Sequence, residues 1–68
     1  MMNCEEMIKI LLSKNFEIKF KIVEFNSAIR YVTEFDSPKA GLHQSWANTI
    51  EESLTKGFNY CFNALNKD

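Results

Sequence analysis

The sequence is poor in the residues that build catalytic and metal sites. Its 68 residues include one histidine, two cysteines, two glycines and one proline. Gly41 and Gly57 stand far apart, so no glycine-rich loop can cradle a phosphate group. Cys4, His43 and Cys61 are separated by tens of residues and match no familiar metal-ligand spacing. We therefore expect no metal, no cofactor and no enzymatic activity.

The sequence also lacks an excess of charge and a long apolar run. Eight basic and nine acidic residues leave a formal net charge of −1, which gives no general attraction to nucleic acid or to anionic lipid. The longest uncharged apolar run is far shorter than the ~20 residues of a membrane-spanning helix. The acidic start of the chain is unlike a signal peptide. We expect a cytoplasmic protein with its two cysteines reduced.

What the sequence does have is periodicity. Asn3 and Glu6 form a capping-box arrangement, and apolar residues at helical spacing follow, which predicts a helix over about residues 4–14 that Asn15 ends in the left-handed conformation. A second helix begins at the capping residues Asn48 or Thr49, and its apolar stripe includes Ile50, Leu54, Phe58 and Cys61.

Between the helices, residues 16–22 and 29–35 alternate apolar with polar side chains, as half-buried strands do. Asn26-Ser27 suits a tight turn between them. A two-residue loop there predicts that Ile22 lies opposite Tyr31 and that Lys19 lies opposite Glu34 as an opposite-charge pair. Residues 41–47 fit either a short third strand or a loop that leads into the second helix.

These elements predict one α+β domain over residues 1–68, with two layers. The order is helix, strand, strand, short strand, helix, and the strands form an antiparallel meander. Both helices are expected to cover one face of the sheet. That face carries the following apolar row: Ile18, Phe20, Ile22, Tyr31 and Phe35.

The outer face of the sheet holds the candidate contact residues. Apolar side chains lie beside charged ones there, and aromatic residues mixed with arginine are typical of contact centres. Phe25 and Trp46 either contact a partner or fold over the ends of the core. The predicted partner-binding residues are Lys21, Val23, Phe25, Arg30, Val32 and Trp46.

Nucleic acid is the alternative partner. Lys19, Lys21 and Arg30 share the outer face and could contact phosphates. The opposing interpretation is a solvated sheet face on which Glu17 and Glu34 partly neutralise the basic side chains.

The element order resembles that of double-stranded-RNA-binding domains, which also run helix, three strands, helix. The resemblance covers nearly the whole chain as topology, and it implies an RNA-binding module. In that family a basic cluster opens the second helix. The corresponding stretch here is "NTIEESLTKG", residues 48–57, which opens with Glu51 and Glu52.

Residues 31–65 resemble HicB-type antitoxins. Those proteins have a strand, a turn with Asp, Pro and Gly, a short strand, and a helix that starts like Thr-x-Glu-Glu. The residues that follow this order are Asp36, Pro38, Gly41, Thr49, Glu51, Glu52 and Ser53. The resemblance implies a regulatory protein that binds a protein partner and self-associates.

The sequence thus predicts a small regulatory binding protein of bacterial or phage type. We expect it to act through protein–protein contact at the face or edge of the sheet, as a homodimer. An RNA-binding module is the second hypothesis.

Overall fold

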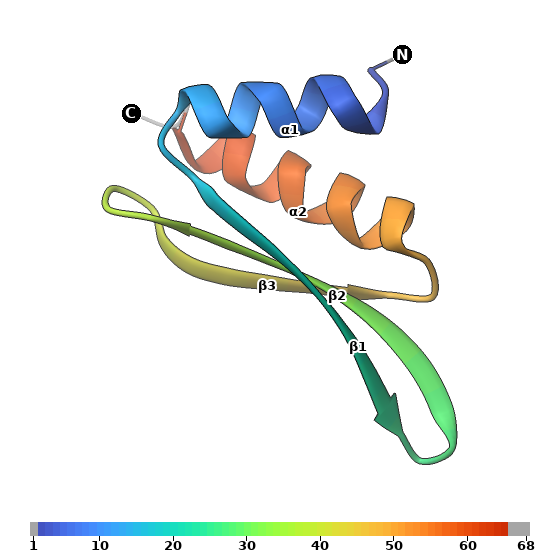
Figure 1. Cartoon of the computed structure of the whole chain (residues 1–68). Helices are drawn as coiled ribbons and strands as arrows, with labels where there is room; N and C mark the ends of the chain where they lie inside the picture. The colour runs from blue at the N-terminus through green and yellow to red at the C-terminus, as the bar shows by residue number, and fades with distance from the viewer. Residues whose placement is uncertain (1, 66–68) are drawn as a thin grey trace.

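Three antiparallel strands form one layer of the protein and two helices form the other (Figure 1). The computed structural model describes residues 2–65. The elements run in the order α1 (Cys4–Ser13), β1 (Glu17–Phe25), β2 (Ala28–Ser37), β3 (Gly41–Ala47) and α2 (Ile50–Leu65). This is the predicted α+β arrangement, and residues 41–47 are a strand. No helix within residues 2–65 is long and apolar enough to cross a membrane.

The predicted capping box opens α1. The Asn3 side chain accepts a hydrogen bond from the Glu6 backbone N–H (2.8 Å), and Glu6 Oε1 accepts one from the Asn3 N–H (3.2 Å). These contacts satisfy two N–H groups that the first helical turn leaves without partners. The helix ends at Ser13, and Asn15 has a positive φ of 68°, so the predicted left-handed residue after the helix is confirmed.

The β1–β2 hairpin has the predicted register. Phe25 lies opposite Ala28, so the loop is the two residues Asn26 and Ser27, whose φ angles are 51° and 63°. Positive φ at both positions is the mirror-image turn that matches the right-handed twist of the strands. From there the ladder continues to Ile22 opposite Tyr31, Lys19 opposite Glu34 and Ile18 opposite Phe35.

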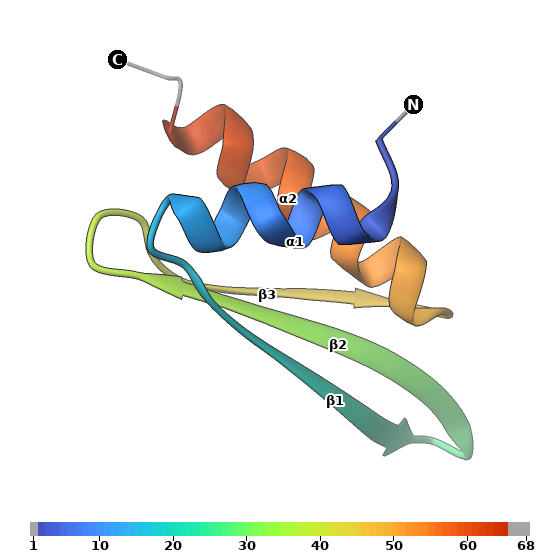
Figure 2. The same ribbon diagram turned by 45° about the horizontal axis from the view of Figure 1, so that its top comes forward.

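The core lies where α2 crosses β2 and β3, with α1 beside α2 (Figures 1 and 2). Phe35 is fully buried there, and Gly57 of α2 lies so close that a Cβ at this position would overlap the Phe35 ring. The absence of a side chain at Gly57 therefore lets α2 approach the sheet closely. The buried cluster consists of Met7, Leu11, Phe16, Phe35, Leu54, Phe58 and Cys61.

A polar contact also lies inside this core. The hydroxyl groups of Thr33 in β2 and Ser53 in α2 are 2.7 Å apart and both residues are fully buried. Ser53 Oγ also donates to the carbonyl of Ile50 (2.9 Å). Because a serine hydroxyl has one proton, Thr33 is then the donor to Ser53. Both hydroxyl groups are satisfied, as buried polar groups must be.

The prediction that the helices bury Phe20 and Ile22 is wrong. Both side chains point to the helix side of the sheet, as predicted, but Phe20 is 47% and Ile22 is 68% exposed. The physical reason is the placement of the helices, because α2 packs on β2 and β3 while the far part of β1 diverges from the helix layer (Figures 1 and 2). Of the apolar residues in β1, Ile18 is packed against the buried cluster. The far half of the hairpin therefore presents two faces to solvent.

Candidate functional site

The projecting end of the hairpin carries large apolar side chains on its helix side. Side chains alternate between faces along a strand, and Thr33 contacts α2, so Tyr31 and Ile29 share its side. Phe20 and Ile22 lie opposite Thr33 and Tyr31 on the same side. We call Phe20, Ile22 and Ile29 the hairpin patch, and all three are 47–68% exposed.

The hairpin patch continues toward the start of α2. Ala47, the last residue of β3, lies opposite Tyr31, and the chain then turns into Ile50, which is also exposed. Figure 1 shows this turn where β3 joins α2, beside the curved part of β2. The hairpin patch and the exposed Ile50 therefore lie toward the same end of the sheet, near the turn from β3 into α2. Sequence reasoning missed this surface, because the alternation of Phe20 and Ile22 predicted burial.

The predicted outer-face residues separate into exposed and buried ones. Phe25 at the hairpin tip and Trp46 in β3 are exposed, and Val23 is half-buried. Val32, however, is only 1% exposed. It lies between Lys21 on one neighbouring strand and Trp46 on the other. The expected apolar area of Val32 on this face is therefore absent.

The basic residues of the outer face have partners within the chain. Lys21 Nζ lies 2.9 Å from Glu34 Oε2, and Gln44 Nε2 donates to the same carboxylate. Hydrogen bonds from Lys21 and then from Gln44 lower the pKa of Glu34 below its ordinary value. Lys19 lies opposite Glu34, as predicted, but the ion pair forms with Lys21.

Arg30 is turned toward its own backbone. Its guanidinium donates to the carbonyl of Ile29 (3.3 Å), and the side chain is half-buried beside Val23 of β1. Of the three basic residues predicted to contact phosphates, Lys21 is thus neutralised by an acidic partner, whereas the carbonyl that Arg30 contacts carries no charge.

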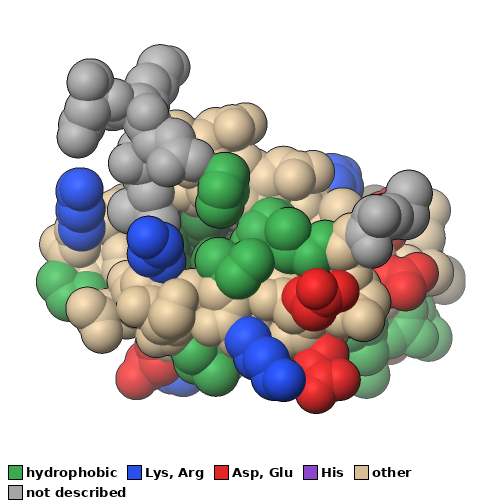
Figure 3. Space-filling model, turned by 90° about the horizontal axis from the view of Figure 1, so that it is seen from above, with side chains coloured by type: hydrophobic (Ala, Val, Ile, Leu, Met, Phe, Trp, Pro, Cys, Tyr) green, Lys and Arg blue, Asp and Glu red, His purple; other side chains and the backbone are tan. Residues whose placement is uncertain are grey.

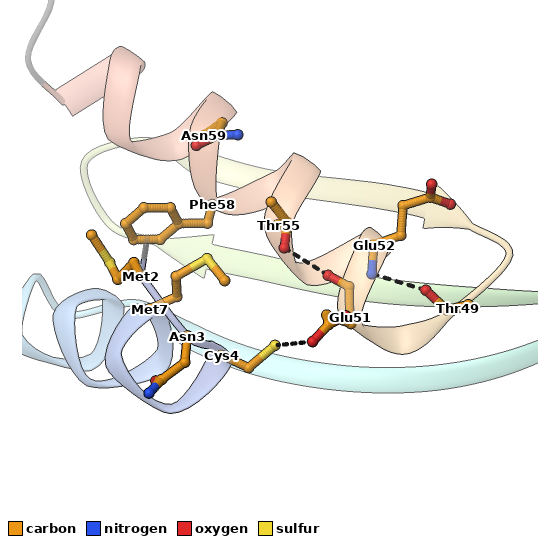
Figure 4. A pocket seen from close by; sticks show the side chains of 10 residues that line it. All are labelled: Met2, Asn3, Cys4, Met7, Thr49, Glu51, Glu52, Thr55, Phe58 and Asn59. Atoms are coloured by element: carbon orange, nitrogen blue, oxygen red, sulfur yellow. Dashed lines mark hydrogen bonds between the residues drawn. The ribbon is translucent and has the colours of Figure 1, made fainter.

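A hollow of about 670 Å³ lies between the N-terminal ends of the two helices (Figure 4). Its apolar wall holds Met7 and Phe58, and the Cys4 thiol lies 3.9 Å from Glu51 Oε2 at its rim. From the helix side, apolar side chains gather along the seam between the helices and acidic ones at one end (Figure 3). The acidic residues of the two first turns are Glu5, Glu6, Glu51 and Glu52.

Glu52 and Thr49 explain the polar rim of this hollow. The Glu52 N–H donates to Thr49 Oγ1 (3.0 Å), and Glu52 Oε1 accepts from the Asn48 N–H. These are capping contacts, and acidic side chains in a first turn also complement the helix dipole. The carboxylates are therefore accounted for by the start of α2.

The single histidine lies among aromatic rings. His43 stacks on Tyr60 of α2 with ring centroids 3.9 Å apart, and Phe35 is its other aromatic neighbour. Burial lowers the pKa of His43, which favours the neutral imidazole. Within residues 2–65, no group of three His, Cys, Asp or Glu residues could hold a metal ion.

Both cysteines are free thiols. Cys61 is buried in the core and burial raises the pKa of its thiol, whereas Cys4 is half-buried at the edge of the hollow. A raised pKa keeps the Cys61 thiol protonated and unreactive.

No protein-family model, curated protein or solved structure matches this chain. The resemblances to HicB-type antitoxins and to double-stranded-RNA-binding domains therefore stay predictions.

Proposed function

We propose that this chain is a non-enzymatic protein-binding module whose contact surface is the hairpin patch. The observation that supports the proposal is the exposure of Phe20, Ile22 and Ile29 on one side of the projecting hairpin. Large apolar patches on soluble domains mark contact sites more often than plain surface. Burying these side chains against a partner would contribute a binding free energy of roughly 25 cal/mol for each Å² of apolar surface removed from water.

The geometry of the hairpin suits recognition by shape. Its register is fixed by the two-residue turn, so the three side chains are held in a fixed order rather than on a loose loop. Ile50 at the start of α2 is a further exposed apolar side chain that a partner could contact. Phe25 on the outer side of the tip extends the contact if the partner wraps around the hairpin.

The sequence-based expectations about regulation, location, origin and self-association are part of the same proposal. A module of this kind acts as a regulator by occupying its partner, with no chemistry of its own. A cytoplasmic location, a bacterial or phage origin and self-association as a homodimer remain expectations to be tested.

Site-specific photocrosslinking tests the contact surface. A photoreactive phenylalanine analogue placed at Ile22 should give a covalent adduct in cells that make the natural partner. The same analogue at Leu12, which is exposed on α1, is the matched control. An adduct from the Ile22 site alone supports the proposal, and equal adducts or none from both sites would contradict it.

The variant Ile22→Lys/Ile29→Lys gives a second test. Both side chains are exposed, so the charges should leave the helical circular dichroism unchanged. The double variant should lose capture of the partner that the crosslinking identifies. Leu12→Lys should retain it, and loss in both variants would mean that the charge rather than the hairpin patch decides binding.

A further inference from the structure

The two outer strands of the sheet leave different backbone groups unpaired. In a two-residue hairpin the residues next to the turn share both backbone hydrogen bonds, so Phe25 and Ala28 form such a pair. Bonded and non-bonded pairs then alternate along the ladder. Consequently the odd-numbered residues of β2 bond to β3, and in β3 the unpaired groups belong to Leu42, Gln44 and Trp46.

One observed contact agrees with this assignment. Lys56 Nζ of α2 donates to the carbonyl oxygen of Trp46 at 3.1 Å. That carbonyl is therefore available to a donor from outside the sheet. The lysine covers one unpaired group at the edge, and the side chains of β3 themselves include no charge and no proline.

Lysines guard the middle of the edge formed by β1. Antiparallel self-pairing places residue i opposite residue 2c − i, where c is the residue on the two-fold axis. Centring on Lys19 or Lys21 sets that lysine against itself, and centring on Phe20 sets Lys19 against Lys21. Like charges directly opposite each other destabilise a strand pair, and lysine is a common guard of sheet edges.

We propose that β3 pairs with β3 of a second copy, antiparallel and centred on Gln44, to give a continuous six-stranded sheet. In this register Leu42 of each copy lies opposite Trp46 of the other, both on the outer face. Both side chains are exposed in the single chain and would cover each other. Gln44 meets Gln44, and every unpaired N–H and C=O group of the edge gains a partner.

The helix layer is compatible with this sheet. Because α2 packs on both β2 and β3, we place its axis about midway between these strands, half a strand spacing inside β3. With strands ~4.8 Å apart, the two α2 helices would then lie about 10 Å apart across the axis, a normal helix-packing distance. Tyr60, which is exposed and stacked on His43, would lie in that contact.

The size of the contact sets the expected strength. A seven-residue strand pair with one flanking helix pair lies near the lower limit of specific interfaces, about 1,000 Å² in total. Lys56 must also release the Trp46 carbonyl. We therefore expect a dimer that dissociates in the micromolar range and is in exchange with the single chain.

Sedimentation equilibrium over a concentration series tests the proposal. The wild type should shift from one chain to two as concentration rises. Gln44→Lys places two lysines against each other on the axis, while in the single chain the new lysine meets Glu34, the present partner of Gln44. This variant should dimerise at least about tenfold more weakly. Phe25→Lys, an equal charge on the same face at the hairpin tip, should not weaken the dimer.

A pair of double variants tests the register. In Leu42→Lys/Trp46→Glu the two introduced charges of opposite sign meet across the axis, and in Leu42→Lys/Trp46→Lys two like charges meet. Both remove the same side chains, so any loss of stability is shared. The first should dimerise at least about tenfold more tightly than the second. Equal dimerisation of the two would overturn the register.

Lys56→Met tests the proposal in the opposite direction, because this variant should strengthen the dimer. It frees the Trp46 carbonyl and keeps an apolar side chain, so the dimer should become several-fold tighter. A mass of one chain for wild type and Lys56→Met alike, up to about 1 mM, would overturn the proposal. Weakening by Phe25→Lys but not by Gln44→Lys would also overturn it, because self-association would then use the hairpin. The proposed function does not depend on this result.

Discussion

Gly57 in α2 lies directly against the ring of Phe35 in β2. Gly57→Ala should gain about 1 kcal/mol of helix propensity, but its methyl group would overlap a ring that is fully buried. Overpacking costs typically 1–3 kcal/mol, so we expect a net loss of up to about 2 kcal/mol in urea unfolding. Phe35→Leu should reduce the additional cost of Gly57→Ala. A stabilised Gly57→Ala variant would show that α2 lies farther from the sheet.

The Thr33–Ser53 contact predicts an asymmetry between two variants. Ser53→Ala removes the acceptor for the buried Thr33 hydroxyl and should cost about 1–3 kcal/mol. Thr33→Val leaves Ser53 still bonded to the Ile50 carbonyl and should cost less. Urea unfolding of both, and of the double variant, measures the difference. A double variant that loses the full sum of the two would show that the hydroxyl groups act independently.

Stability should fall on acidification in two steps. The pKa of His43 is lowered in the folded protein, so below its ordinary value of 6.5 the unfolded chain binds the proton more readily and stability decreases. The pKa of Glu34 is lowered as well, and its contribution, present above 4.5, is lost as the pH falls below that value. Denaturant midpoints between pH 3 and about pH 8 should show both steps.

Because His43 is the single histidine, substitutions can assign the two steps. His43→Gln should remove the step near neutral pH and keep the lower one. Glu34→Gln should reduce the lower step and keep the upper one. A step near neutral pH that persists in His43→Gln would contradict the assignment.

Val32 and Phe25 should respond differently to the same change. Val32→Ser places a hydroxyl at a position that is fully covered by its neighbours, so a loss of about 1–3 kcal/mol is expected. Phe25→Ser alters an exposed tip and should stay within about 0.5 kcal/mol. Thermal unfolding followed by circular dichroism distinguishes the two. Similar losses in both would place Phe25 in the core.

Duplex RNA should not be retained by this protein. Glu34 neutralises Lys21 on the outer face, and the chain as a whole has a formal net charge of −1. A gel shift at low salt is the most sensitive condition, because phosphate contacts weaken steeply as salt rises. A salt-dependent shift that Lys19→Ala/Arg30→Ala abolishes would favour the RNA-binding alternative instead.

Much of the fold could be predicted because local chemistry determines it. The Asn3–Glu6 capping box and the turn at Asn26-Ser27 are both sequence-local, and the turn fixes the whole β1–β2 register. Alternation then gives the side to which each strand residue points. It placed Phe20 and Ile22 on the helix side, where they are.

The alternation of apolar and polar residues does not show whether a strand residue is buried by the helices. Ile18 and Ile22 have the same local pattern, but only Ile18 reaches the helices, because burial depends on how far α1 and α2 extend over the sheet. Val32 is the reverse case, an outer-face residue covered by long side chains of its neighbours. The choice of Lys21 over Lys19 as partner of Glu34 likewise depends on side-chain geometry that spacing does not contain.

The contrast between the two thiols offers a built-in reporter of conformational opening. Cys61 lies in the core with its pKa raised by burial, so alkylating reagents can reach it only when the packing around α2 opens. Its rate of modification, measured in a Cys4→Ser background, would therefore record how often the core opens, without any introduced label.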